Sequence, residues 1–229
     1  MNSMRAGAWL VLRALRGRSA WLIAAAAVAF ATIASVAERK VALGDAASRA
    51  LQGPAFGLAI PIAVFALTST ALQRGRLDEA MGSLVLIGAG RRAAAIGAAA
   101  ALSVAAALLG LVTASASALA AHGLFTGASI ADAATAGWIG ALVSIAYALL
   151  FAAASNFGAR GGGRFAVLAI DLVIGPMSTR VASVLPRAHA LNLLGAPDVA
   201  PGFSQRASFA ALFMLMALFV LVLARRVRP

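Results

Sequence analysis

The chain has 229 residues, of which 62% are hydrophobic and 11% are charged, and its formal net charge is +12. Soluble globular domains carry about 25% charged residues, so this composition excludes that class and indicates an integral membrane protein. The absence of cysteine excludes disulfide bonds and thiolate sites. We expect a single all-α transmembrane domain over residues 1–229.

The first 18 residues precede the first long apolar run and carry a pattern of their own. At about 100° per residue, Arg5, Arg13 and Arg16 fall on one side of a helix and aliphatic side chains fall on the other. This pattern is typical of an amphipathic helix along the membrane interface. The alternative is a signal peptide cleaved after Ala37, but the apolar run is longer than the usual core of about 7–15 residues.

Six apolar runs follow one another along the chain, and all but the fifth are long enough to cross a bilayer. The fifth run, FAVLAIDLVIGP, is interrupted by Asp171 and ended by Pro176. We expect six transmembrane helices, at approximately residues 19–37, 54–72, 93–121, 133–155, 165–175 and 207–224. A broken, re-entrant segment over about residues 176–205 precedes the last one and contains a small helix at LPRAHALNLL.

The distribution of basic residues predicts the orientation. With the N-terminus inside, 13 of the 19 basic residues fall in cytoplasmic segments and six fall in external ones. The net charge is therefore a topology signal and not a sign of nucleic-acid binding, and the C-terminal ARRVRP contacts anionic lipid headgroups. Both termini are expected in the cytoplasm, and the alanine- and arginine-rich composition indicates a bacterial inner (plasma) membrane.

The connection after the second run, LQRGRLDEAMGSLVLIGAGRR, is far more polar than its neighbours. Asp78 and Glu79 lie near its start, where carboxylates favour the positive end of a helix dipole, and glycines precede Arg91 and Arg92. The spacing predicts a helix over about residues 75–87 with an apolar stripe made by Leu77, Met81, Leu84 and Val85. This stripe either lies on the membrane surface or docks into a groove on a cytoplasmic partner.

The same connection resembles a segment of the permease subunits of type-2 ATP-binding-cassette exporters, which move lipids, polysaccharides, drugs and peptides. In that family the second span is followed by Arg-Gly-Thr-Leu-Glu-Leu-Leu-Leu, a few residues, Arg-Arg and the third span. Arg76, Asp78 and Gly82 depart from the pattern. The matching residues are Arg74, Gly75, Leu77, Glu79, Arg91 and Arg92.

The resemblance implies that residues 75–87 are a coupling helix seated in a separate ATPase subunit. It also implies a second permease chain, either a copy or a paralogue, and a cargo path through the spans; a haem-export permease is a narrower option. ATP and Mg would then be held by the ATPase. The implied coupling residues are Arg74, Arg76, Leu77, Asp78, Glu79, Met81, Leu84 and Val85.

The residues themselves agree that this chain is not an enzyme. A P-loop ends in Gly-Lys, but the only lysine, Lys40, follows Glu38 and Arg39. An intramembrane protease would need a Gly-x-Ser-Gly motif in one span and a histidine in another, whereas Ser83 lies in the polar connection and neither histidine lies mid-span. The distant histidines predict no metal site.

Two further classes of membrane protein stay open. An ion-driven transporter needs buried ionisable groups, and Asp171 is the sole candidate well inside a span. Asp171 either has a structural role, protonated or hydrogen-bonded to a neighbouring helix, or lines the substrate path or a dimer interface. A scaffold without transport activity also fits the composition.

Overall fold

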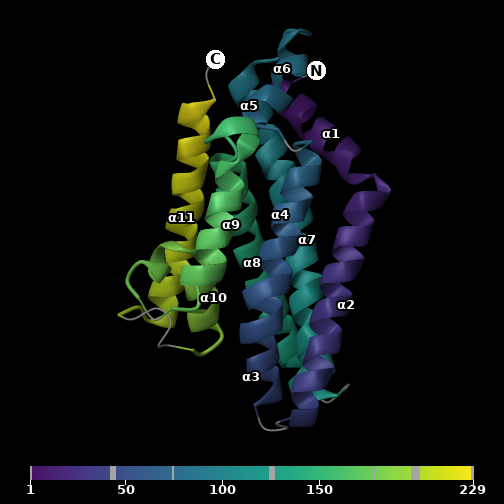
Figure 1. The fold of residues 1–229 in the computed structure, drawn as a ribbon, viewed down its shortest axis with the longest axis vertical. Helices are drawn as coiled ribbons and strands as arrows, with labels where there is room; N and C mark the ends of the chain where they lie inside the picture. Colours follow the sequence, from purple (N-terminus) through teal and green to yellow (C-terminus); the bar gives the residue numbers. More distant parts are fainter. Residues whose placement is uncertain are drawn as a thin grey trace.

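The computed structural model describes residues 2–41, 45–73, 75–123, 127–177, 179–196 and 202–227. Over these residues the chain folds into an elongated bundle of helices (Figure 1). The start of α1 (Ser3–Leu15) and the end of α11 (Gln205–Arg226) lie at the same end of the bundle, which we call the terminal end. The predicted all-α class is confirmed.

Within the described ranges, five helical stretches are long and apolar enough to cross a membrane. This confirms the prediction of a multi-pass membrane protein. They are α2 (Arg18–Val41), the continuous stretch Ala46–Ala71, α7 (Arg91–His122), α8 (Gly127–Ala154) and α11.

The second of these stretches is a composite. It begins with α3 (Ala46–Ala50), widens into the π-helix η1 (Leu51–Ala59) and ends as α4 (Ile60–Ala71). Pro54 lies inside η1 and Pro61 lies in the first turn of α4. A proline removes a backbone donor and clashes with the preceding turn, and a change of helical type absorbs that defect.

The fifth predicted span is the exception. Its helix, α9 (Gly163–Ile174), has 12 residues, fewer than the roughly 20 that a helix needs to cross the hydrocarbon core. Beyond it lie η3 (Ala182–Val184) and α10 (Pro186–Leu193), which is the small helix predicted at LPRAHALNLL. Figure 1 shows α10 alongside α11. Residues 178 and 197–201 of the predicted re-entrant segment lie outside the described part of the chain.

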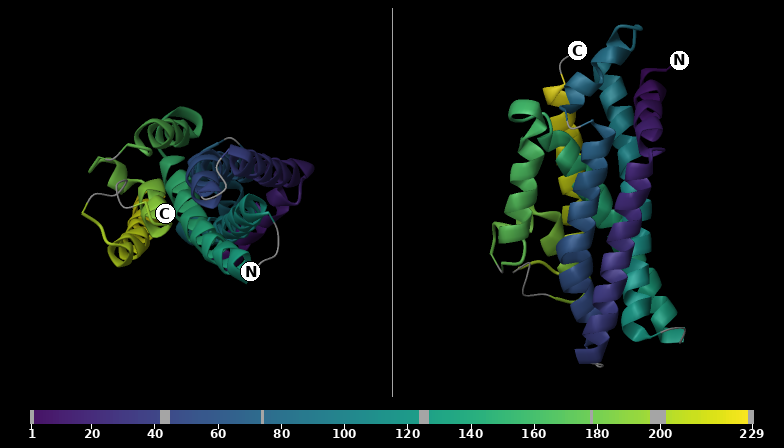
Figure 2. Two further views of the ribbon diagram at one scale, coloured as in Figure 1. Left: turned by 90° about the horizontal axis from the view of Figure 1, so that it is seen from below. Right: turned by 45° about the vertical axis from the view of Figure 1, so that its right-hand side comes forward.

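The long helices lie side by side (Figure 2), and glycines allow close backbone contacts between them. The predicted interfacial helix ends at Leu15 as α1, and its Gly7 leaves room for the backbone of Ala94 in α7. In the same way, Gly110 of α7 faces Gly140 of α8 with their backbones in contact. Small residues permit such approaches in membrane bundles, where packing replaces the hydrophobic effect between helices.

Candidate functional site

The polar connection predicted as one helix lies at the terminal end between α4 and α7. The structure corrects the prediction for residues 75–87, because two short helices, α5 (Leu77–Ala80) and α6 (Gly82–Val85), replace the continuous one. The break falls at Met81, immediately before Gly82. Glycine is among the poorest helix formers, so the chain bends there at low cost. We call residues 75–90 the terminal loop.

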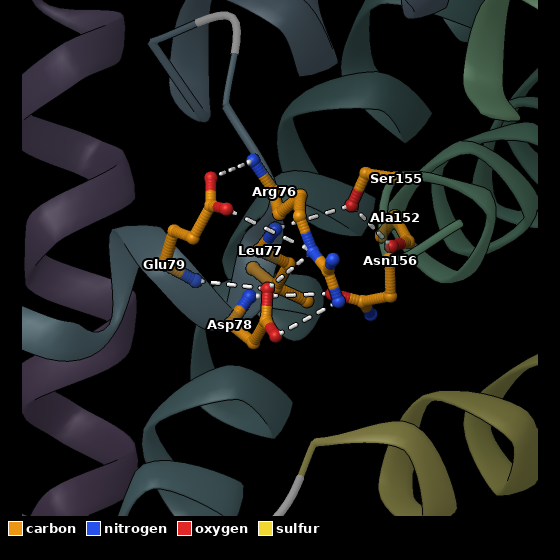
Figure 3. A network of polar contacts seen from close by, with 7 residues as sticks. All are labelled: Arg76, Leu77, Asp78, Glu79, Ala152, Ser155 and Asn156. Carbon is orange, nitrogen blue, oxygen red and sulfur yellow. Dashed lines mark hydrogen bonds and ion pairs between the residues drawn. The ribbon is translucent and has the colours of Figure 1, made fainter. Parts of the chain in front are cut away.

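The base of the terminal loop is attached to the end of α8 (Figure 3). The backbone N–H of Leu77 donates to Ser155 Oγ at 3.3 Å, and that of Asp78 donates to Asn156 Oδ1 at 3.2 Å. Ser155 in turn donates to the carbonyl of Ala152 at 2.7 Å. The first N–H groups of a helix have no partner within it, so the residues that follow α8 cap α5.

The two carboxylates of the connection hold this base in shape. Asp78 accepts from Arg76 through both oxygens, from Nε at 3.1 Å and from Nη2 at 3.2 Å. Glu79 accepts from the backbone N–H of Arg76 at 3.2 Å, as the N3 residue of a capping box does. All three side chains are partly exposed, so each ion pair contributes at most about 1 kcal/mol.

The predicted apolar stripe faces inward, which corrects its expected roles. Leu77 and Met81 are 1% and 0% exposed and belong to the core of the bundle, and Leu84 is partly buried against them. Only Val85, at 37%, is open. The two most buried residues of the stripe are therefore unavailable to a membrane surface or to a partner's groove.

The exposed apolar surface lies farther along, at the tip of the terminal loop. Leu86 is 89% exposed and Ile87 is 70% exposed. Sequence reasoning missed these two residues because it followed helical spacing. The run Val85-Leu86-Ile87 could have indicated them, because three consecutive aliphatic residues cannot all face the same side of a helix and some must be exposed.

Arg74 lies outside the described residues. Asp171 of α9 is fully buried and accepts a hydrogen bond from the hydroxyl of Tyr147 in α8 at 2.8 Å. Arg187 of α10 lies close enough to act electrostatically on Asp171, and its Nη1 donates to the carbonyl of Gly57 at 3.2 Å. Asp171 thus ties α9 to α8 beside buried Arg187, which is one of the six basic residues that the sequence analysis counted in external segments.

His189 is the other buried ionisable group of α10. One ring nitrogen, Nε2, lies 2.7 Å from the carbonyl oxygen of Ser183, and Nδ1 lies 3.1 Å from Ser208 Oγ in α11. In the described part of the chain, no three His, Cys, Asp or Glu side chains are grouped so as to hold a metal ion.

Comparisons with protein-family models, with curated proteins and with solved structures find no match. The fold and the hydropathy define the class, an all-helical multi-pass membrane protein. Its terminal end carries a capped loop with an apolar tip.

Proposed function

We propose that this chain is the membrane-spanning permease subunit of a type-2 ATP-binding-cassette exporter. A separate cytoplasmic ATPase would bind ATP and Mg, and a second permease, either a copy or a paralogue, would complete the cargo path. In this proposal α9 and the segment around α10 together form a sixth, broken crossing. The terminal end faces the cytoplasm of a bacterial cell, and the chain lies in its inner membrane.

The observation that carries the proposal is the form of the terminal loop. Its tip bears Leu86 and Ile87, which are exposed, while its base is attached to α8 and to the core. Figure 1 shows α6 projecting beyond the ends of α1 and α11, away from the spans. Two large apolar side chains in that position favour a groove on a cytoplasmic protein over water or over the membrane surface.

The contacts of the terminal loop also suit the transmission of force. A push on the tip would pass through α5 to α8, because the N–H groups of Leu77 and Asp78 are bonded to Ser155 and Asn156. It would reach α7 through residues 88–90, where Gly88 has a φ of +81°. The loop is hydrogen-bonded to the end of α8 on one side and joined to α7 through a flexible glycine on the other. A displacement of the tip could therefore change the orientation of α8 relative to α7.

Co-purification from the native membrane tests the proposal. The tagged chain is extracted in mild detergent, and the proteins that accompany it are identified by mass spectrometry. We expect a soluble ATPase with a P-loop, and we expect its loss from the double variant Leu86→Asp and Ile87→Asp. Ser83→Asp is the control, because Ser83 is an exposed residue of the same loop and the change adds one of the two negative charges without removing an apolar side chain.

Retention of the ATPase by the double variant would contradict the proposed contact. Recovery of the chain without any ATPase would contradict the exporter assignment itself. The ion-driven transporter and the scaffold would then be the remaining classes. Of these, only the transporter gives a function to the buried pair of Asp171 and Tyr147.

A further inference from the structure

A cleft of about 990 Å³ opens between α2, α4 and the start of α9. Its lining changes character with distance from the terminal end. The polar part lies nearer that end and includes Ser69, Thr70, Gln73, Arg160 and Arg164. The apolar part includes Leu22 and Ile23 of α2, Phe65, which lies one turn before Ser69 in α4, and Phe165, which follows Arg164 directly in α9.

Arg164, in the first turn of α9, is the most unusual residue of the cleft. It is 1% exposed, and its Nε and Nη1 atoms have no hydrogen-bond partner among the described residues. Arginine stays charged in proteins, and a buried charge without a counter-charge is strongly unfavourable. None of the described residues that line the cleft is acidic. The described lining therefore offers Arg164 no counter-ion, and a bound anion would supply one.

Two further features point to a binding site at the polar part. The Oγ atom of Ser69 is buried and has no partner in the described structure. Gln73 and Arg160 have φ values of +49° and +51°, and they are the only non-glycine residues in the described ranges with positive φ. Backbone conformations of this kind are unfavourable and cluster at ligand sites, and both of these residues line the cleft.

We propose that this cleft binds an amphiphile with an anionic phosphate headgroup. Arg164 and Arg160 hold the phosphate, since a guanidinium matches phosphate oxygens with paired N–H groups, and the hydroxyl of Ser69 donates a further bond. The acyl chain lies along Leu22 and Phe65 in the apolar part. The proposal needs only the membrane class of the protein and does not depend on an ATPase partner.

The phosphate has two conceivable sources, a membrane phospholipid or a soluble phosphate ester. The apolar part favours the phospholipid, because a soluble phosphate would leave Leu22, Phe65 and Phe165 without an occupant. An anionic phospholipid reaches the cleft by lateral diffusion. Its headgroup lies at the level of the terminal end, where the arginines are.

Binding measurements on the purified full chain in detergent test this inference. The probes are dioctanoyl phosphatidylglycerol, dioctanoyl phosphatidylcholine and inorganic phosphate, and the readout is the Kd from microscale thermophoresis. We expect phosphatidylglycerol to bind at least about tenfold more tightly than either other probe. Arg164→Gln should raise the Kd for phosphatidylglycerol by about tenfold or more, because hydrogen bonds between charged groups are lost.

Arg160→Gln provides a variant that keeps the fold, because Arg160 is exposed. Arg160→Gln should raise the Kd for phosphatidylglycerol by about fivefold, which is the effect of losing one cation near an anionic headgroup. Arg92→Gln is the control, since Arg92 is exposed at the same end and lies outside the cleft, and it should leave the Kd unchanged.

Equal binding of the two lipids, or equal effects of Arg160→Gln and Arg92→Gln, would overturn the site. If inorganic phosphate bound as tightly as phosphatidylglycerol, the proposal of an amphiphilic ligand would be overturned, and the site would be assigned to a soluble phosphate ester.

Discussion

Replacement of Gly140 by alanine tests the packing of α7 against α8. An added Cβ would meet the carbonyl oxygen of Gly110 and would lie 2.8 Å from Cβ of Ala114. Carbon atoms pack at about 3.5–4.0 Å, so the helices must separate by roughly 1 Å. Overpacking costs typically about 1–3 kcal/mol, and the upper value applies because a backbone atom cannot rotate away.

The better helix propensity of alanine returns about 1 kcal/mol, which leaves a net loss of about 2 kcal/mol for Gly140→Ala. Gly53→Ala is the matched control. Gly53 lies in η1, and an added Cβ there meets nothing within 4 Å. This substitution should be neutral or stabilising, by up to about 1 kcal/mol.

Both free energies of unfolding are measured by steric trapping in bicelles, with thermal unfolding in detergent as a second readout. The expected result is a difference of about 2–3 kcal/mol between the two variants, with a loss of stability only for Gly140→Ala. Equal stabilities would refute the close approach of α7 and α8 on which the arrangement of the spans depends.

Two further predictions concern buried groups. Leu77→Asp places a carboxylate at a 1% exposed position and should destabilise the bundle by about 3 kcal/mol or more, seen as a lower thermal midpoint in detergent; an unchanged midpoint would mean that the residue is at the surface. Tyr147→Phe removes the hydrogen bond to Asp171 and should lower the free energy of unfolding by about 2 kcal/mol, measured by steric trapping. Phe65→Tyr adds a hydroxyl to another ring of the bundle, and it should not reproduce this loss.

The hydropathy and charge patterns predicted the membrane-spanning helices because the bilayer constrains both patterns. A helix must carry about 20 apolar residues to cross, which makes spans such as 19–37 and 207–224 readable from the sequence. The structure extends these to α2 (Arg18–Val41) and α11 (Gln205–Arg226), because helices continue into the interfaces where polar residues are tolerated. The shortness of α9 could also be predicted, since Asp171 interrupts the fifth apolar run and Pro176 ends it.

The burial of charged residues could not be predicted from the sequence. Arg164 and Arg187 were counted with the exposed topology signals, yet both are buried. Their burial depends on which helices meet around them, and that is a property of tertiary packing that no local pattern carries. The inward direction of Leu77 has the same origin, because an amphipathic stripe shows that a face is covered without showing by what.

Site-specific photo-crosslinking in native membranes tests the exporter assignment most directly. A photoreactive benzoyl-phenylalanine replaces Leu86 at the tip of the terminal loop, or Leu108, an exposed residue of the α7 span, as the control. We expect the probe at Leu86 to form an adduct with a soluble protein whose peptides contain a P-loop, and we expect no such adduct from the probe at Leu108. Adducts with lipid alone at both positions would contradict an ATPase docked on the terminal loop.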